Sequence, residues 1–391
     1  MMRSVRRIGA VAAVAMTLTV VAGTSSASPP TTTAAASNTT TWWVDSIWIS
    51  PLAGWVLGEG KAGCSTCVII KYTDDGGRTW TMVPTPAGRT LLSGGSTYTC
   101  QNSGGCVTHL VFVNREDGYL FGPDLFTTTD GGRAWHRQAG EATVALQIVA
   151  PGVVWRLTYD STGCPGPCRI TLLQQAVGSS TAWSTVRAPF NGTGTFFAPQ
   201  IVSTDTARVL VAFYGHIAGG VTSHAFFYVT GNEGRSWSLR ADPCGRTGRV
   251  EDDAYDTSAT GPGVVVVGCV AKSDSNTGFV LVSRDGGRTF GPRRPVPPTD
   301  LSMIDAVSAS TIVLATGNIS GGGPLTYTLE TSTNGGVTWR TVVRDPETLT
   351  SSTPGESYLG FVSPTVGHWI GYGNKLWTTT DGGEHWTASN V

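Results

Sequence analysis

The sequence predicts an all-β protein, a seven-bladed β-propeller of four-stranded antiparallel blades. Three observations lead to this prediction. One short motif recurs at intervals of about fifty residues, alternating apolar segments bounded by glycines fill each interval, and no segment shows a helical period. Repeats of this length are typical of architectures in which each repeat is one structural unit. Four short strands per repeat indicate a propeller blade.

The N-terminal segment lies outside the predicted fold. Arg3, Arg6 and Arg7 precede an uncharged stretch at 8–23, and small residues follow at Ser25 and Ala27. This order of basic, apolar and small residues is typical of a secretory signal peptide. We therefore expect a signal peptide at 1–27, a Thr-, Pro- and Ala-rich linker at 28–41 and a single propeller at 42–391. The protein is expected to be secreted to the cell exterior, and the paired arginines leave both the general and the twin-arginine export routes open.

The recurring motif has six copies with one pattern. Each copy begins with Ser or Thr and has Asp or Asn third, Gly fifth and an aromatic residue eighth. The third, fifth and eighth residues of the copies are Asp75, Gly77, Trp80, Asp130, Gly132, Trp135, Asn232, Gly234, Trp237, Asp285, Gly287, Phe290, Asn334, Gly336, Trp339, Asp381, Gly383 and Trp386. The aromatic residues lie 47 to 55 residues apart except for one interval of 102, which predicts a seventh, degenerate copy at Trp183.

The residue types of the motif suit a tight turn between the third and fourth strands of a blade. An Asp or Asn oxygen can accept backbone N–H groups within the turn. Gly can adopt the positive φ that a tight hairpin requires. The aromatic residue begins the outgoing strand and fills space against its neighbours. We therefore interpret Asp75, Asp130, Asp285 and Asp381 as structural rather than catalytic.

The other strands of each unit follow a regular order. The first strand alternates, as in "SIWISP" and "YLGFVSP", and the second lies between glycines, as in "GWVLG", "GYLFG", "GVVVVG" and "GHWIG". The final motif ends five residues before the C-terminus, so the last blade should contain its own outer strand. The ring is then expected to close by packing rather than by strand exchange, although "TTTWWV" could add a strand to the first blade.

The "DGGxxW" form of the motif resembles the Asp-box, or bacterial-neuraminidase repeat, over essentially the whole mature chain. Its form and spacing are most similar to propellers related to the photosystem II assembly and stability factor, and sialidases and xyloglucan-type hydrolases carry the same box. The resemblance implies that the boxes lie on the face away from any active site. The box therefore predicts the fold and says little about function.

Eight cysteines in an exported chain predict disulfides. They occur as close pairs, and the sequence leaves their connectivity open: Cys64 and Cys67, Cys100 and Cys106, Cys164 and Cys168, Cys244 and Cys269. The segment "CSTC" could instead be a redox motif or half of a metal site, but neither a strand–helix pattern nor a nearby His accompanies it. All eight cysteines are expected opposite the boxes, on long loops that either hold a ligand surface in place or protect the protein from proteases.

The segment "CGRTGRVEDDAYDT" is the most polar cluster and is expected to lead into the innermost strand of blade five. Asp252, Asp253 and Asp256 are weak candidates for a catalytic acid and base. Candidate ligand contacts are Arg246, Arg249, Glu251 and Tyr255. The cluster could equally be a solvated loop. The six His residues show no metal-type spacing, so neither a metal nor a cofactor is expected.

Two functions fit these features. The first is a non-enzymatic binding or scaffold module for a protein or glycan at the cell exterior, and the second is a sialidase-like glycoside hydrolase. An enzyme is less favoured because the first strands lack the Arg that binds the sialic acid carboxylate in sialidases. The boxes also hold Arg78, Arg133, Arg235 and Arg288 on the wrong face. A net charge of −1 gives no reason to expect nucleic acid as a partner. We expect a monomer without a transmembrane segment in the mature chain.

Overall fold

The computed structural model describes residues 42–391 with gaps. The gaps are residues 61–66, 87–89, 92–105, 161–167, 180–181, 195, 205–207, 217–222, 246–251, 272–273, 299, 318–325, 346–357 and 372–374. In several strands only the backbone is described. Contacts within the chain divide it into two units, Met1–Asn38 and Thr39–Val391. All described strands belong to the second unit.

The described residues form seven sheets, one for each predicted blade. Blade 1 contains β1 (Trp42–Trp48), β2 (Gly54–Gly60), β3 (Cys67–Thr73), β4 (Thr81–Val83), β5 (Thr90–Leu91) and β6 (Cys106–Val107). Blade 2 contains β7 (His109–Phe112), β8 (Asp117–Phe121), β9 (Leu125–Thr129) and β10 (His136–Gln138). Blade 3 contains β11 (Ala142–Ala150), β12 (Val153–Tyr159), β13 (Cys168–Ala176), β14 (Ser184–Thr185) and β15 (Gly192–Gly194).

The remaining four blades have four strands each. Blade 4 contains β16 (Phe196–Ser203), β17 (Val209–His216), β18 (Ser223–Thr230) and β19 (Ser238–Arg240). Blade 5 contains β20 (Asp252–Thr260), β21 (Val264–Ala271), β22 (Asp274–Ser283) and β23 (Arg294–Pro295). Blade 6 contains β24 (Asp300–Ala306), β25 (Ile312–Gly317), β26 (Tyr327–Ser332) and β27 (Arg340–Asp345). Blade 7 contains β28 (Tyr358–Phe361), β29 (Gly367–Ile370), β30 (Lys375–Thr379) and β31 (Thr387–Asn390).

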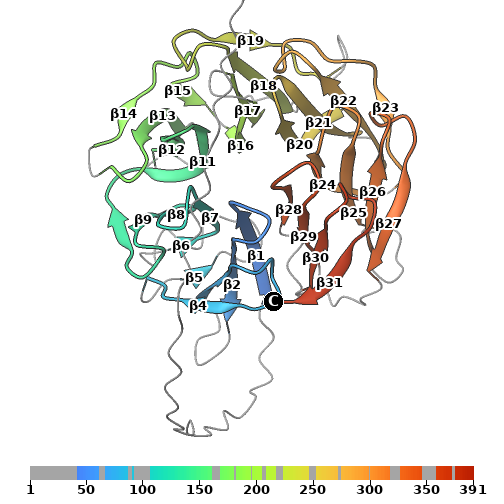
Figure 1. Cartoon of the computed structure of the whole chain (residues 1–391). Helices are drawn as coiled ribbons and strands as arrows, with labels where there is room; N and C mark the ends of the chain where they lie inside the picture. Colours follow the sequence, from blue (N-terminus) through green and yellow to red (C-terminus); the bar gives the residue numbers. More distant parts are fainter. Residues whose placement is uncertain are drawn as a thin grey trace, which may run out of the picture. The chain divides into compact units, whose positions relative to one another are not determined.

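Within each blade the chain passes through its four main strands from the innermost to the outermost, and these four strands are antiparallel neighbours. The first strands β1, β7, β11, β16, β20, β24 and β28 surround the centre of the ring (Figure 1). Two blades carry short additions, since β5 and β6 extend the edge of β3 and β15 pairs with β13. The prediction of a seven-bladed propeller with four-stranded antiparallel blades is therefore confirmed.

The Asp-box turns lie between the third and fourth strands. In blade 1, β3 ends at Thr73 and β4 begins at Thr81. The fourth box residue donates its N–H to the turn between the first two strands of its own blade, as in Gly76 to Leu52 (2.9 Å). Boxes and first turns therefore share one end of the blades, which we call the box face. Because the strands are antiparallel, the loops between second and third strands and between blades belong to the other end, the connection face.

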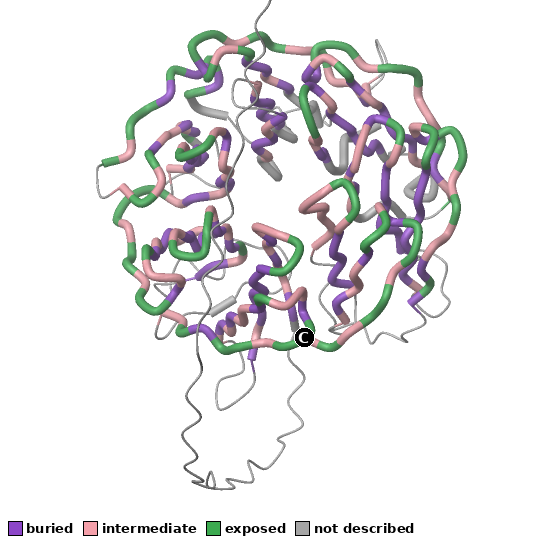
Figure 2. The backbone as a smooth tube through the Cα atoms, in the orientation of Figure 1, coloured by how far each residue is buried: buried purple, intermediate pink, exposed green. Residues whose placement is uncertain are grey.

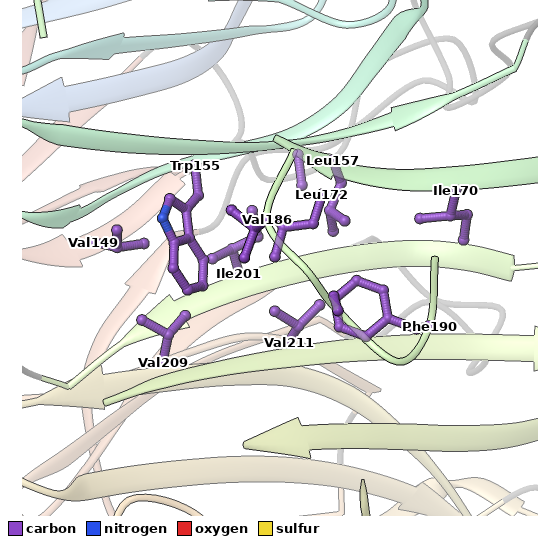
Figure 3. Close-up of a cluster of buried hydrophobic side chains, with 12 residues drawn as sticks. Val149, Trp155, Leu157, Ile170, Leu172, Val186, Phe190, Ile201, Val209 and Val211 are labelled. Atoms are coloured by element: carbon purple, nitrogen blue, oxygen red, sulfur yellow. The ribbon is translucent and has the colours of Figure 1, made fainter. Parts of the chain in front are cut away.

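Apolar side chains fill the space between neighbouring blades. The buried residues form seven clusters, one at each interface between consecutive blades. Central strands are buried on both sides, and all six residues of β25 are buried (Figure 2). Between blades 3 and 4, Trp155 and Leu157 face Ile201 and Val211 (Figure 3). Burying a side chain such as Leu157 stabilises the fold by about 2 kcal/mol.

The degenerate seventh copy keeps the packing of the others. Trp183 immediately precedes β14 and packs into the cluster between blades 2 and 3. The buried guanidinium of Arg156 lies 4.3 Å from the centre of the Trp183 ring. In the intact copies the aromatic residue likewise packs toward the preceding blade, as Trp237 does against Trp155. The aromatic position of the motif is therefore used even where the Asp is missing.

Side-chain packing closes the ring. Blade 7 contains its own outer strand β31, so it takes no strand from blade 1. Trp42 and Trp43 pair with β2 as the beginning of β1, so they do not form the additional strand that the sequence allowed. Across the seam, Trp43 and Trp48 of blade 1 pack with Ile370 and Leu376 of blade 7.

Candidate functional site

In the Asp-box, the polar side chains hold the turn together. In blade 1, Thr73 Oγ1 accepts the N–H of Gly77 (3.0 Å) and donates to Asp75 Oδ1 (2.8 Å). Asp75 also accepts the hydroxyl (2.6 Å) and the N–H (2.9 Å) of Thr79. The hydrogen bonds from the hydroxyl and N–H of Thr79, and then from Thr73, lower the pKa of Asp75 to about 2. A carboxylate held this way is suited to fixing a turn and not to transferring protons near neutral pH.

The fifth-position glycine brings the box against the preceding blade. Gly77 has φ +86°, and a Cβ there would lie 2.7 Å from Leu376 of blade 7. A Cβ at Gly336 would lie 2.7 Å from Val280 of blade 5. Gly is therefore required both by the turn and by the interface. The Asp-box turns on the box face therefore contact the preceding blade.

The polar cluster predicted from sequence is described only in part. Asp252, Asp253, Tyr255 and Asp256 belong to β20, the innermost strand of blade 5, with a register shift between Ala254 and Asp256. Only their backbone is described. The candidate ligand contacts Arg246, Arg249 and Glu251 lie outside the described residues. The catalytic and ligand-binding assignments of this cluster therefore stay predictions.

One disulfide anchors the connection between blades 4 and 5. Cys244, which follows β19, bonds to Cys269 of β21, and both residues are fully buried. Arg293 donates to the Cys244 carbonyl (2.6 Å), and its guanidinium lies 4.2 Å from the centre of the Phe279 ring. Cys67 and Cys106 are also disulfide-bonded. Cys64, Cys100 and Cys164 lie outside the described residues, and the Cys168 side chain is not described.

Two carboxylates that the sequence analysis did not select join the innermost strands of neighbouring blades. Asp45 of β1 accepts the N–H of Leu110 in β7 (2.9 Å). Asp305 of β24 accepts the N–H of Phe361 in β28 (2.6 Å). Both acids lie next to large apolar residues, in "VDSIW" and "MIDAV", and this contrast is the signal in the sequence that could have identified them. The acidic β20 is therefore not the only inner strand with carboxylates.

Asp305 forms hydrogen bonds to groups on more blades than Asp45 does. Its Oδ1 accepts the N–H of Ala306 (2.8 Å) and the hydroxyl of Ser258 in blade 5, while Oδ2 accepts Phe361. The Asp305 carboxylate therefore links blades 5, 6 and 7. Ser258, Ala306 and Phe361 are neutral donors that orient the carboxylate.

A cavity of about 320 Å³ opens beside Asp305 at the centre of the ring. Residues of the innermost strands of blades 3 to 7 line it. The polar lining residues are Gln147, Ser203, Thr257, Ser258 and Asp305, and the others are apolar. The described lining thus contains one carboxylate and no Lys, Arg or His. Its size suits a side chain or a single small ring rather than a large ligand.

The described histidines do not form a site. His109 and His136 belong to blade 2, His216 and His224 to blade 4, and His368 and His385 to blade 7, so they occur in pairs within blades. Where side chains are described, no group of three or more His, Cys, Asp or Glu could hold a metal ion. The described part also contains no helix long and apolar enough to cross a membrane.

His368 is instead part of the ring-closing seam. Its ring stacks on Trp48 with the centres 3.5 Å apart and the planes 10° apart. The side chain is fully buried, and Nδ1 lies 3.2 Å from Thr378 Oγ1. Burial lowers the pKa of His368 to about 3, so the imidazole is neutral at physiological pH.

Comparison with solved structures identifies the architecture. YCF48 bound to a D1 peptide superposes with a TM-score of 0.55 at 16% identity, covering 88% of this chain and 94% of that one. The chain is a seven-bladed β-propeller structurally like YCF48. YCF48 from Cyanidioschyzon merolae gives a TM-score of 0.51 at 15% identity, covering 88% of this chain and 96% of that one.

A polysaccharide lyase shares this YCF48-like fold. A PL25 ulvan lyase bound to a -[GlcA(1-4)Rha3S]- saccharide gives a TM-score of 0.53 at 10% identity, covering 90% of this chain and 97% of that one. No family model and no curated protein matches the chain in sequence. At these identities the comparisons establish the fold, which is shared by a peptide-binding protein and an enzyme.

Proposed function

We propose that this propeller is an exported, non-enzymatic binding module whose partner is a protein. One observation carries the proposal: the described carboxylates at the centre of the ring, Asp45 and Asp305, accept backbone N–H groups of the next blade. A catalytic acid or base must reach the substrate and exchange a proton with it. These two carboxylates are committed to holding blades in place.

Two further features support a protein partner. YCF48, which has the same architecture, is bound to a peptide in its structure. This is an analogy at the level of the fold. In addition, the buried Cys244–Cys269 bridge fixes the start of the long connection between blades 4 and 5. Holding this described start in place before binding reduces the entropy lost there, which favours affinity for a partner.

The alternative, a sialidase-like glycoside hydrolase, is less well supported. An acidic sugar needs cationic groups that neutralise its carboxylate. The described lining of the central cavity offers Asp305 and no Arg or Lys. Export rests on the basic–apolar–small order at 1–27 and on the disulfides, which persist in oxidising compartments.

The test screens the purified full chain against a displayed library of random fifteen-residue peptides, a glycan array and a panel of chromogenic glycosides. A matched variant carries Asp252→Ala, Asp253→Ala and Asp256→Ala. We expect specific peptide binding that is lost when the protein is unfolded, and no turnover of any glycoside.

Two results would overturn this proposal. Turnover that the triple variant abolishes would identify a hydrolase with its site on β20. Binding confined to the glycan array, with no enriched peptide, would identify a lectin-like module instead of a protein-binding one.

A further inference from the structure

The central cavity lies apart from the disulfide-anchored connection on the connection face. It is lined by the innermost strands of blades 3 to 7, which run from the connection face to the box face. On blades 3 to 6 the lining residues fall in the second half of the strand, as Ser203 does at the end of β16. The cavity therefore lies in the half of the ring nearer the box face.

Hydrogen-bonding groups from four blades line this cavity. Gln147 comes from blade 3, Ser203 from blade 4, Thr257 and Ser258 from blade 5, and Asp305 from blade 6. A carboxamide and a hydroxyl can both donate and accept, whereas a carboxylate only accepts. A ligand that matches this lining therefore carries hydrogen-bonding groups in several directions, and these groups must donate as well as accept.

Gln147 offers hydrogen-bonding groups that the protein itself does not use. Its side chain is half-buried and makes no hydrogen bond within the part of the chain that the structure describes. By contrast, Ser258 donates to Asp305, and Ser203 donates to the carbonyl of Val149 (3.1 Å). The Gln147 carboxamide therefore keeps an acceptor oxygen and two donor hydrogens for a bound molecule.

Charge and size narrow the class of ligand. The described lining contains no Lys, Arg or His, so an acidic ligand would find no counter-charge there. An ammonium or guanidinium group carries donors only, so it would leave the amide hydrogens of Gln147 without an acceptor. A volume of about 320 Å³ is at the lower end of the range for small-molecule sites, roughly 300 to 1,000 Å³. It suits one ring, whose C–H groups can lie against Ile201, Ile304 and Leu359.

We propose that the central cavity binds one neutral sugar ring, with the Gln147 carboxamide hydrogen-bonded to its hydroxyl groups. Each sugar hydroxyl both donates and accepts, and the hydroxyls are distributed around the ring as the polar lining groups are around the cavity. The ligand is a neutral hexose, either a free monosaccharide or the terminal residue of a glycan. This inference goes beyond the proposed protein-binding function, because the site lies apart from the anchored connection.

NMR titration of the full chain tests the site with defined sugars. The probes are glucose, galactose and mannose, and the comparison compounds are glucuronate, glucosamine, glycerol and acetamide. We expect saturable spectral changes with at least one hexose, and binding about tenfold tighter than that of each comparison compound, because these carry a charge or lack the sugar ring. A disaccharide that ends in the same hexose distinguishes the sources. Undiminished binding indicates the end of a glycan, and lost binding indicates a free monosaccharide.

Two glutamine variants locate the site. Gln147→Leu should weaken hexose binding by about tenfold, because Leu has a similar size and cannot hydrogen-bond. The control is Gln174→Leu, since Gln174 is half-buried on β13 of the same blade but does not line the cavity. It should leave hexose affinity unchanged. Gln147 makes no hydrogen bond within the described residues, so its replacement should preserve the fold, and thermal unfolding of both variants checks this.

Several results would overturn the sugar site. These are no binding of any hexose, equal binding of glycerol or acetamide, tighter binding of glucosamine or glucuronate, and undiminished hexose binding in a folded Gln147→Leu variant.

The proposed function is tested separately from the sugar site. If Gln147→Leu loses the hexose and still binds the library peptides, both proposals stand. If peptides are enriched but no hexose binds, the protein-binding function stands and the sugar site fails. If a hexose binds through Gln147 but the library yields no peptide, the protein-binding function fails and the sugar site stands.

Discussion

Glu233 shows what the fourth position of the Asp-box requires. It is the one described residue other than glycine with a positive φ, at +58°. In the other intact boxes this position is Gly, for example Gly335 at φ +70°. The left-handed region costs a residue with a Cβ about 1–2 kcal/mol. The sequence pattern identified Gly at position five, whereas the structure shows that both positions four and five are left-handed.

We therefore expect Glu233→Gly to stabilise the protein. The exposed Glu233–Arg235 ion pair (2.8 Å) that it removes is worth little. The net gain in free energy of unfolding should be about 0.5–1 kcal/mol, measured by denaturant titration. The reciprocal change Gly335→Glu should destabilise by a similar amount. Equal stability of both variants and the parent would show that the left-handed turn carries no strain.

At the scale of the element, the box works with either Asp or Asn. Asn232 accepts the Thr230 hydroxyl (3.0 Å) and the Ser236 N–H (2.8 Å), as the Asp residues do. It also donates its amide to the Ser236 hydroxyl (2.8 Å). The acceptor oxygen, and not the charge, is therefore the shared requirement.

Asp285→Asn should accordingly be tolerated, whereas Asp285→Ala should destabilise the fold. Alanine would leave the Thr289 N–H and the Ser283 hydroxyl without this acceptor, at a cost of about 1 kcal/mol in the free energy of unfolding. Thermal unfolding of the two variants at pH 7 tests the difference. If Asn is as harmful as Ala, the charge is required after all.

The stability difference between the parent and Asp285→Ala is also expected to depend on pH. Burial raises the pKa of Asp285, but the hydrogen bonds from Thr289 and Ser283 outweigh it and lower the pKa to about 2. A carboxyl group whose pKa falls on folding stabilises the native state above the unfolded pKa of about 4, and this contribution is lost as pH falls toward 2. The advantage of the parent over Asp285→Ala should therefore shrink between pH 4 and pH 2. An advantage that is constant over this range would contradict the assigned pKa.

At the scale of the whole molecule, we expect the seam between blades 7 and 1 to be sensitive to acid. The buried His368 has a pKa of about 3, whereas an unfolded histidine titrates near 6.5. Below about pH 6.5 the unfolded chain binds a proton that the folded chain does not. Stability should then fall by about 1.4 kcal/mol per pH unit for this proton, down to about pH 3.

In His368→Phe, stability should decrease less steeply as pH falls, because Phe can stack on Trp48 and does not titrate. His136, which is exposed on β10, supplies the control variant His136→Phe. Free energies of unfolding measured from pH 7 to pH 4 should separate the two variants. Identical slopes in the parent and His368→Phe would show that the seam does not exclude the proton.

The proposed export predicts both the N-terminus and the disulfide content of the mature chain. We expect the mature chain to begin at Ser28 and to have lost eight cysteine hydrogens through four disulfides. Intact mass measurement of the protein recovered from outside the cell, before and after reduction, gives both values. A chain that keeps residues 1–27 inside the cell would contradict the proposed localisation.

The sequence by itself determined the fold, because each Asp-box carries its own turn chemistry and recurs at a fixed interval. Trp183 could be assigned to a degenerate copy from spacing alone, and the structure places it beside β14. The sequence also predicted that the last blade contains its own outer strand, because the final motif ends just before the C-terminus. These features are local, so the residues that determine them lie close together in the sequence.

Only the tertiary structure decided which side chains meet. Asp305 contacts Ser258 and Phe361, which are 47 and 56 residues away, and His368 stacks on Trp48 from the other end of the chain. Such contacts depend on blade register and on ring closure, which no local pattern encodes. The polar segment at 246–256 therefore stands out in the sequence, whereas Asp45 and Asp305 do not. Asp45 and Asp305 acquire their role only when the next blade lies beside them.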